Sequence, residues 1–401
     1  MRLRWAICAA LTALVLLPAG LACAEKPAAA PQQAVGPAPE PAAPAQPGMT
    51  PEDEADVEIG KAAAEEVKKQ FKILDDSPAA ARLAAIVAKL RPVTEKPYLD
   101  YQVRVIDSKA LNAFALPGGF LFVTEGIIEA AESEDELAAI LGHEMAHCAL
   151  AHSRRLMSKD ERYTKILAPI IVASILTQPR SVDAGKIALV GSLIVQDAVN
   201  HYGREAEYEA DAAAVRYLYK SGAYNPVAVL TVVEGLTRME AAEAQVEAGV
   251  FQTHPKGQER VQATLAELEK LGVPIERRRV THSLVASAAA VMQDGREIGE
   301  LRLNDRAVFR PAAEVDGESP VVRAQHSAEI LNALLLSNLE LLEVGLRRDG
   351  DEVVATARGE TLFRITKSDA EFHKSSVDAL AQQALTAIRL GFQEEKVKRA
   401  Y

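Results

Sequence analysis

The segment from Leu141 to His147 carries the residues best suited to chemistry in this chain. It contains His-Glu-x-x-His, with His143 and His147 four positions apart and Glu144 directly after the first histidine. In a helix each residue advances by about 100°, so residues four apart lie about 40° apart on one face. Both imidazoles can therefore bind one metal ion, and Glu144 is placed to take a proton from a water held there.

The residues around this segment predict a helix that would carry it. Ser133 and Glu136 have the spacing of a capping box, and the acidic residues of this turn suit the positive end of the helix dipole. Histidines in an apolar helix can also be ordinary core residues, so a metal site needs a further ligand elsewhere. The apolar positions at helical spacing are Leu137, Ile140, Leu141 and Met145.

A second, acidic helix supplies a candidate for that ligand. Glu207 and Asp211 lie four positions apart and share one face, whereas Glu205 and Glu209 each lie about 200° around from Glu207. We therefore expect Glu207 to be the third metal ligand and Asp211 to accept the second ring N–H of a ligand histidine. Arg204, one turn before Glu207, is positioned to pair with a carboxylate. Taken alone, this segment would be a solvated acidic helix face.

A strand is predicted ahead of the first helix. A Pro-Gly-Gly turn precedes Phe120–Thr124, which is short and apolar. Proteases with a metal helix of this type hold their substrate as an added strand on a sheet edge, so this strand is a candidate substrate site. The alternative is an ordinary core strand. The candidate substrate-binding residues are Gly119, Phe120, Leu121 and Phe122.

Three motifs, in this order, resemble those of a known family of zinc endopeptidases. The family is that of HtpX and the CAAX prenyl proteases, of the gluzincin type, and the resemblance is to its soluble periplasmic BepA/LoiP-like branch. It covers about residues 52 to 272. The motifs are Asn112–Gly119, His143–His147 and Arg204-x-x-Glu207-x-x-x-Asp211.

The resemblance implies a fold, a cofactor and roles for the site residues. The implied fold class is α+β, with a mainly helical zincin-type metallopeptidase domain that contains a small sheet. The implied cofactor is one Zn2+ ion per chain, which would polarise a peptide carbonyl and acidify its bound water. Glu144 would be the general base. The implied zinc ligands are His143, His147 and Glu207.

Two further histidines, His254 and His152, are expected to differ in their relation to the metal site. Thr253-His254-Pro255, with Arg260 following, is similar to a segment that comes after the ligand helix in the family. His254 could occupy the open metal position, line it and stabilise an oxyanion, or be a structural loop residue. His152 lies about 180° around the helix from His143, so we expect it to face away from the metal.

Charge and cysteine content exclude several classes of function. A net charge of −11 over 401 residues offers no basic surface for nucleic acid. Cys8 and Cys23 lie in or at the edge of an N-terminal leader, and Cys148 is the third cysteine of the chain. The mature chain is therefore expected to lack a disulfide framework and the paired cysteines of a structural zinc site.

Residues 1–24 are expected to be an export signal. Two arginines precede the apolar run Trp5–Leu17, which is too short to span a membrane. Cleavage before Glu25 would give a soluble periplasmic protein, whereas cleavage at a lipobox would make Cys23 a lipidated first residue that associates with the membrane. Residues 25–51, rich in Ala and Pro, are expected to form a flexible tether.

Two folded domains are expected after the tether. Residues 52–275 would form the metallopeptidase domain, in which the apolar segments 166–176 and 187–199 are either buried helices or a flap near a membrane or over the cleft. Residues 276–401 would form a smaller α+β accessory domain. Its two Asp-Gly hairpins, about 55 residues apart and each followed by a helix, indicate two strand-hairpin-helix repeats. We expect a binding, docking or regulatory role for it, with an unknown partner.

The sequence thus predicts an exported zinc-dependent endopeptidase. By resemblance, its substrates would be misfolded or misassembled cell-envelope proteins, which is a role in protein quality control. The alternative is a chaperone or assembly factor that binds such proteins and rarely cuts them. The presence of Glu144 together with all three ligands favours the enzyme, because a protein that only binds does not need a general base.

Overall fold

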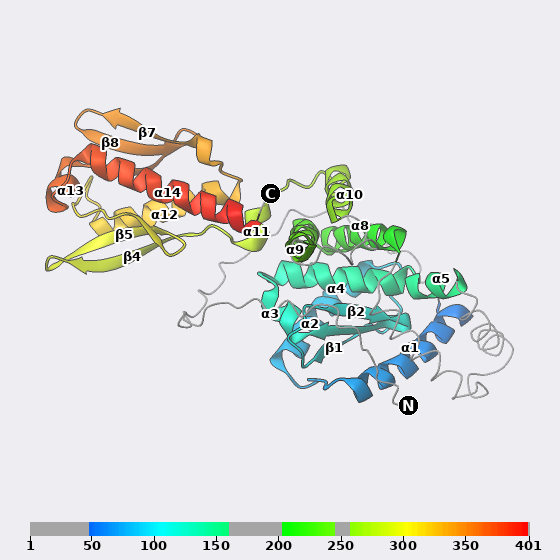
Figure 1. Ribbon diagram of the computed structural model, residues 1–401. Coiled ribbons are helices and arrows are strands. Elements are labelled where there is room, and N and C mark those ends of the chain that lie inside the picture. Colours follow the sequence, from blue (N-terminus) through cyan, green and yellow to red (C-terminus); the bar gives the residue numbers. More distant parts are fainter. Residues whose placement is uncertain (1–47, 160–202, 245–256, 400–401) are drawn as a thin grey trace. The chain divides into compact units, whose positions relative to one another are not determined.

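The computed structural model describes residues 48–159, 203–244 and 257–399, which are coloured in Figure 1. These residues fall into two compact units divided between Pro274 and Ile275. Both units combine helices with small sheets, which confirms the predicted α+β fold class. The export leader, most of the tether, the apolar segments 166–176 and 187–199 and the Thr253–Pro255 segment lie outside the described residues.

The described part of the first unit is mainly helical and contains one three-stranded sheet. Its strands and short 3-10 turns are β1 (Gln102–Ile106), β2 (Ala113–Leu116), β3 (Phe120–Thr124), η1 (Arg91–Val93) and η2 (Pro117–Gly119). Its helices are α1 (Pro51–Gln70), α2 (Pro78–Leu90), α3 (Glu125–Ala130), α4 (Glu134–Ala149), α5 (His152–Lys159), α8 (Arg204–Ser221), α9 (Val227–Ala244) and α10 (Gly257–Lys270).

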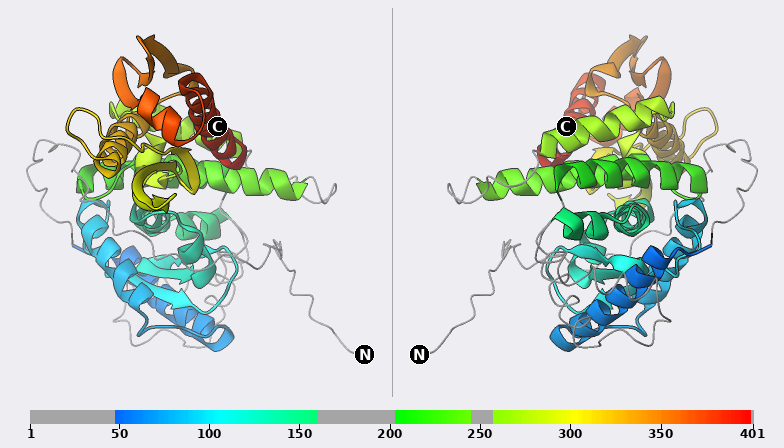
Figure 2. Two further views of the ribbon diagram at one scale, coloured as in Figure 1. Left: turned by 90° about the vertical axis from the view of Figure 1, so that its left-hand side faces the viewer. Right: turned by 90° about the vertical axis from the view of Figure 1, so that its right-hand side faces the viewer.

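Helix α4 lies at the centre of this unit. In Figures 1 and 2 the sheet lies on one side of α4 and the green helices α8 and α9 lie on the other. The helix begins at Ser133, whose hydroxyl accepts the Glu136 N–H at 3.2 Å. The hydroxyl of Thr231, on α9, donates to the Glu136 carboxylate at 2.8 Å. The start of α4 is therefore fixed to the helices that cover it.

The sheet has the strand order β1-β3-β2, with β1 parallel and β2 antiparallel to β3. Residues Phe120 to Thr124 of β3 are all buried. The two outer strands pack on different helices, since β1 lies against α2 and β2 against α4. The sheet therefore places β2 next to the helix that carries the two histidines of the metal motif.

Helix α1 fixes the turn between β2 and β3. Its Gly60 lies against η2 so closely that a Cβ there would be 1.8 Å from the Pro117 carbonyl oxygen. Only glycine allows this approach. The start of α1 is held by Asp53, which receives hydrogen bonds from Lys96 at 2.6 Å and from the Tyr98 hydroxyl at 2.6 Å.

The second unit contains two antiparallel three-stranded sheets, β4-β5-β6 and β7-β8-β9. Its strands are β4 (Ala286–Gln293), β5 (Arg296–Leu303), β6 (Arg306–Phe309), β7 (Val344–Asp349), β8 (Glu352–Ala357) and β9 (Glu360–Ile365). Its helices and 3-10 turn are α11 (Arg277–Thr281), α12 (Pro320–Leu336), η4 (Leu341–Glu343), α13 (Lys367–Phe372) and α14 (Val377–Arg399).

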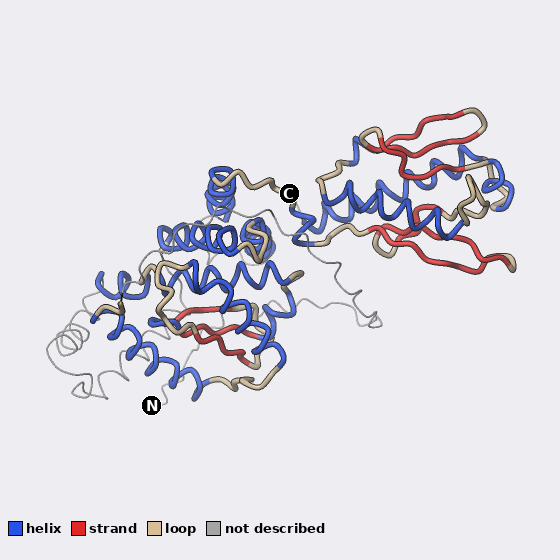
Figure 3. Tube along the Cα trace, turned by 180° about the vertical axis from the view of Figure 1, so that it is seen from behind, coloured by secondary structure: helices blue, strands red, loops and turns tan. Residues whose placement is uncertain are grey.

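Helices α12 and α14 lie between the two sheets of this unit, as Figure 3 shows from behind, and each contacts both sheets. Each sheet is followed along the chain by one of these long helices. A buried ion pair joins two of the helices, because Arg323 of α12 binds the Asp369 carboxylate of α13 at 3.0 Å through both terminal nitrogens. One apolar core runs between the sheets.

Within the described ranges, no helix combines the length and the apolar character needed to cross a membrane.

Candidate metal centre

Three side chains of the first unit converge as metal ligands would. The Nε2 atoms of His143 and His147 are 3.0 Å apart. Glu207 places Oε2 3.5 Å from His143 Nε2 and Oε1 3.7 Å from His147 Nε2. Donors on a tetrahedral zinc ion with bonds of about 2.0–2.1 Å lie about 3.3 Å from one another. The three observed separations lie on both sides of that value, so this donor set fits zinc.

His143 is oriented by Asp211. Its Nδ1 lies 2.9 Å from Asp211 Oδ1, and the Asp211 side chain is 2% exposed. A carboxylate accepts hydrogen bonds only, so Nδ1 carries a proton, and in the neutral, metal-bound ring Nε2 would offer its lone pair to the metal ion. Helix α8 supplies both Glu207 and Asp211, one helical turn apart.

Arg260 of α10 binds both of these carboxylates. It donates to Asp211 through Nε and Nη2, each at 2.8 Å, and its Nη1 lies 3.0 Å from Glu207 Oε2. Arg204 was expected from its sequence position to pair with a carboxylate, and the carboxylate it reaches is that of Glu259. Arg204 is 60% exposed and reaches Glu259 at 4.0 Å, because it lies at the solvent-exposed start of α8. The packing of α10 on α8 brings Arg260 to the site. In the sequence Arg260 follows the Thr253–Pro255 segment, but its position there indicates no role.

The charges of the site suit a ligand and a base. Burial would raise the pKa of Glu207, but the hydrogen bond from His143 and the charges of His143 and Arg260 outweigh it and lower the pKa to about 2. Glu207 is therefore a carboxylate at neutral pH, as a metal ligand must be. Burial raises the pKa of Glu144 to about 7, with the charge of His143 opposing the rise and that of Glu207 adding to it. A carboxyl with a pKa near neutrality is well matched to proton transfer.

The structure corrects the predicted substrate-binding strand. Phe120, Leu121 and Phe122 belong to β3, which pairs with β1 on one edge and with β2 on the other. A strand with both edges paired cannot receive a substrate as an added strand. Gly119 ends η2, at a φ of +99° that favours glycine, and is buried against Asp100. The sequence identified the strand but not its place in the sheet, which depends on long-range pairing.

The structure also corrects the prediction that His152 faces away from the metal site. Helix α4 ends at Ala149, and Ala151 adopts a left-handed φ of +52°, so that His152 begins a new helix, α5. Its Nδ1 lies 2.8 Å from His147 Nδ1, and its Nε2 lies 3.1 Å from Glu209 Oε2. Glu209, which was expected to point away from Glu207, contacts His152 and Arg155. The turn contains no glycine or proline, so no residue type marked the break in the helix.

His254 lies outside the described residues, and its three alternative roles stay predictions.

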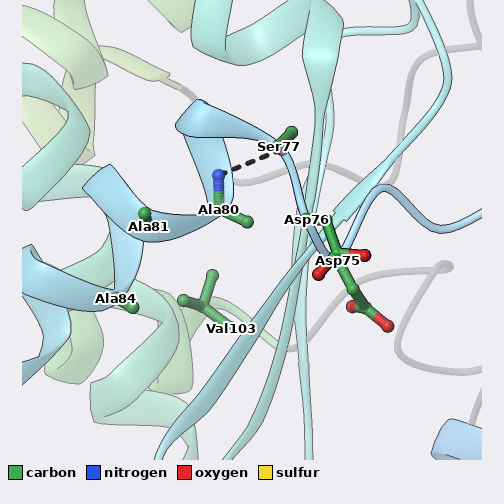
Figure 4. Close-up of a pocket in the computed structure, with 7 residues that line it drawn as sticks. All are labelled: Asp75, Asp76, Ser77, Ala80, Ala81, Ala84 and Val103. Carbon is green, nitrogen blue, oxygen red and sulfur yellow. Dashed lines mark hydrogen bonds between the residues drawn. The ribbon is translucent and has the colours of Figure 1, made fainter.

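A shallow depression elsewhere in the first unit does not include the metal centre. It lies between the start of α2 and β1, as the close-up in Figure 4 shows. One of its two carboxylates, Asp75, is paired with Arg104 at 2.7 Å. The residues that line it are Asp75, Asp76, Ser77, Ala80, Ala81, Ala84 and Val103.

The two units match different family profiles. The sequence profile of peptidase family M48 matches residues 78–268, which include all three candidate ligands and Glu144. A domain of unknown function matches residues 300–395, within the second unit.

Individual relatives are similar to part of the first unit. The mitochondrial metalloendopeptidase OMA1 of Schizosaccharomyces pombe is 30% identical over 186 residues, which are 46% of this chain and 51% of that protein. The beta-barrel assembly-enhancing protease of Escherichia coli is 28% identical over 158 residues, 39% of this chain and 32% of that protein. The mitochondrial metalloendopeptidase OMA1 of Danio rerio is 30% identical over 131 residues, 32% of this chain and 27% of that protein. The chain thus spans about half, or less, of the length of these relatives.

Proposed function

Because residues 78–268 form a peptidase family M48 domain, we propose that this chain is a zinc-dependent endopeptidase. The observation that carries the proposal is the convergence of His143, His147 and Glu207, with the buried Glu144 next to the first of them along α4. Two imidazoles and one carboxylate are a donor set that zinc proteases use, and they leave a fourth position for water. A bound zinc ion would supply Lewis-acid chemistry and lower the pKa of its water.

The side chains of this chain divide the remaining tasks. Glu144 takes a proton from the attacking water and returns it to the leaving amine, which its raised pKa of about 7 favours. Asp211 holds His143 in the tautomer that leaves Nε2 free to bind metal. Arg260 holds Glu207 and Asp211 in register, since it binds both carboxylates.

We propose β2, in place of β3, as the strand along which a substrate peptide lies. Of the two outer strands of the sheet, β2 is the one that packs against α4. An extended peptide aligned with β2 would therefore pass along the helix that carries His143 and His147. Alignment by backbone hydrogen bonds accepts many sequences, which suits a protease acting on unfolded chains.

We further propose that the substrates are misfolded or misassembled proteins of the cell envelope. The export signal predicted over residues 1–24 would deliver the chain to the periplasm, and a lipid on Cys23 would hold it at the membrane. The similarity to a bacterial beta-barrel assembly-enhancing protease agrees with this substrate class. A chaperone that does not cut is the alternative.

The variant Glu144→Gln tests this function. It removes the base and keeps all three ligands, so we expect casein cleavage to fall by about 100-fold or more while zinc content stays unchanged. Glu205→Gln is the matched control, because Glu205 is exposed, and it should cleave as the wild type does. Cleavage by Glu144→Gln at the wild-type rate would refute the general-base role. A wild type that suppresses aggregation without cutting would support the chaperone.

A further inference from the structure

We propose that His152 is a positioning residue of the metal centre, which fixes the tautomer and the orientation in which His147 offers Nε2 to the metal. The two rings meet through their Nδ1 atoms, 2.8 Å apart, on the side of His147 away from His143 Nε2 and Glu207. This inference rests on the proposed function, because it takes His147 as a ligand.

The direction of the hydrogen bonds among His147, His152 and Glu209 follows from Glu209, the group farthest from the metal centre. Glu209 is paired with the guanidinium of Arg155 through both of its terminal nitrogens, and as a carboxylate it can only accept. His152 Nε2, 3.1 Å from Glu209 Oε2, is therefore the N–H end of its ring. In a neutral imidazole the other nitrogen is an acceptor, so His152 Nδ1 accepts the Nδ1–H of His147. The lone pair of His147 is then on Nε2.

The surroundings of His152 fix its position. Its side chain is 0% exposed, and that of His147 is 2% exposed. The next turn of α5 is tied on two sides, because Arg154 binds Asp53 and Asp56 of α1 while Arg155 binds Glu209 of α8. Turning the His152 ring away from the His147 Nδ1–H would also break its contact with Glu209.

Both ligand histidines are thus connected to a carboxylate of α8. His143 reaches Asp211 directly, at 2.9 Å, whereas His147 reaches Glu209 through the ring of His152. Glu209 and Asp211 lie two positions apart on the helix and so point in different directions. The His152 ring lies between His147 and Glu209 and contacts both. Replacing such an outer partner typically weakens metal binding by about 10- to 100-fold.

The test compares His152→Phe with His152→Asn. Phenylalanine keeps the ring shape and removes the acceptor, so we expect zinc affinity, measured by competition with a chromophoric chelator, to fall by about 10- to 100-fold. Asparagine places an amide oxygen near the position of Nδ1, so it should restore most of that affinity. In the cobalt-substituted protein, His152→Phe should shift the visible absorption bands and His152→Asn should return them toward the wild type. A change in packing alone would not be rescued in this way.

The outer carboxylate provides a second test that does not depend on the folding of His152→Phe. Glu209→Ala should weaken zinc binding, whereas Glu205→Ala, on the same helix and exposed, should not. Wild-type zinc affinity and wild-type cobalt spectra in both His152→Phe and Glu209→Ala would overturn the inference. These measurements need no substrate, so they test the role of His152 separately from the proposed function. If zinc affinity depends on His152 and Glu209 but the chain does not cut peptides, the protease function is refuted and the role of His152 stands.

Discussion

At the scale of single residues, the three candidate metal donors come from two helices, α4 and α8. His143 and His147 share a face of α4, and Glu207 and Asp211 share a face of α8. The sequence did not predict what other helices contribute. Arg260 arrives through the packing of α10 on α8, and His152 arrives through a helix break that no glycine or proline announces.

The ligand role of Glu207 leads to a prediction at this scale. Glu207→Ala removes one of three donors and leaves the Arg260 charge less compensated, so zinc affinity should fall by more than about 100-fold. Glu205→Ala, two positions earlier on the same helix, should retain wild-type affinity. Both are measured by chelator competition on the purified variants. Zinc bound by Glu207→Ala with wild-type stoichiometry and affinity would show that the third ligand is a different residue.

At the scale of elements, the sequence predicted where strands and helices form better than it predicted which elements lie next to one another. Phe120–Thr124 is a strand, as its apolar run indicated, but its pairing with β1 on one edge and β2 on the other makes it the middle strand. Strand order depends on which distant segments meet, and the pattern within one strand does not encode this. Helix α4 likewise begins where the capping residue Ser133 predicted, whereas its end was not signalled.

The contact between α1 and η2 leads to a prediction at this scale. A Cβ on Gly60 would lie 1.8 Å from the backbone oxygen of Pro117, which cannot move without displacing β2 and β3. Gly60→Ala should therefore reduce the free energy of unfolding of the first unit by about 2–3 kcal/mol. Gly345→Ala is the control, because a Cβ at Gly345 meets nothing within 4 Å; it should change stability by less than about 0.5 kcal/mol.

Hydrogen exchange followed by mass spectrometry measures this effect in each unit separately. Faster exchange across α1, β2 and β3 in Gly60→Ala, with the second unit unchanged, is the expected result. Equal protection of these elements in Gly60→Ala and wild type would show that the turn tolerates a side chain there.

At the scale of the whole molecule, the chain joins a peptidase family M48 domain to a second unit that the family match does not reach. The second unit has its own apolar core between two sheets and its own buried ion pair, Arg323–Asp369. Its repeated Asp-Gly hairpins and helices were visible in the sequence, because turns and amphipathic helices are local. A binding, docking or regulatory role stays a proposal for this unit, since the metal-ligand cluster of the described residues lies in the first unit.

Metal analysis combined with a casein assay tests the zinc-dependent peptidase activity that we propose for the first unit. We expect one zinc ion per purified chain, loss of cleavage after chelation, and recovery when one equivalent of zinc is added back. Full cleavage by a chain freed of metal, or a folded wild-type chain that binds no zinc, would refute this function.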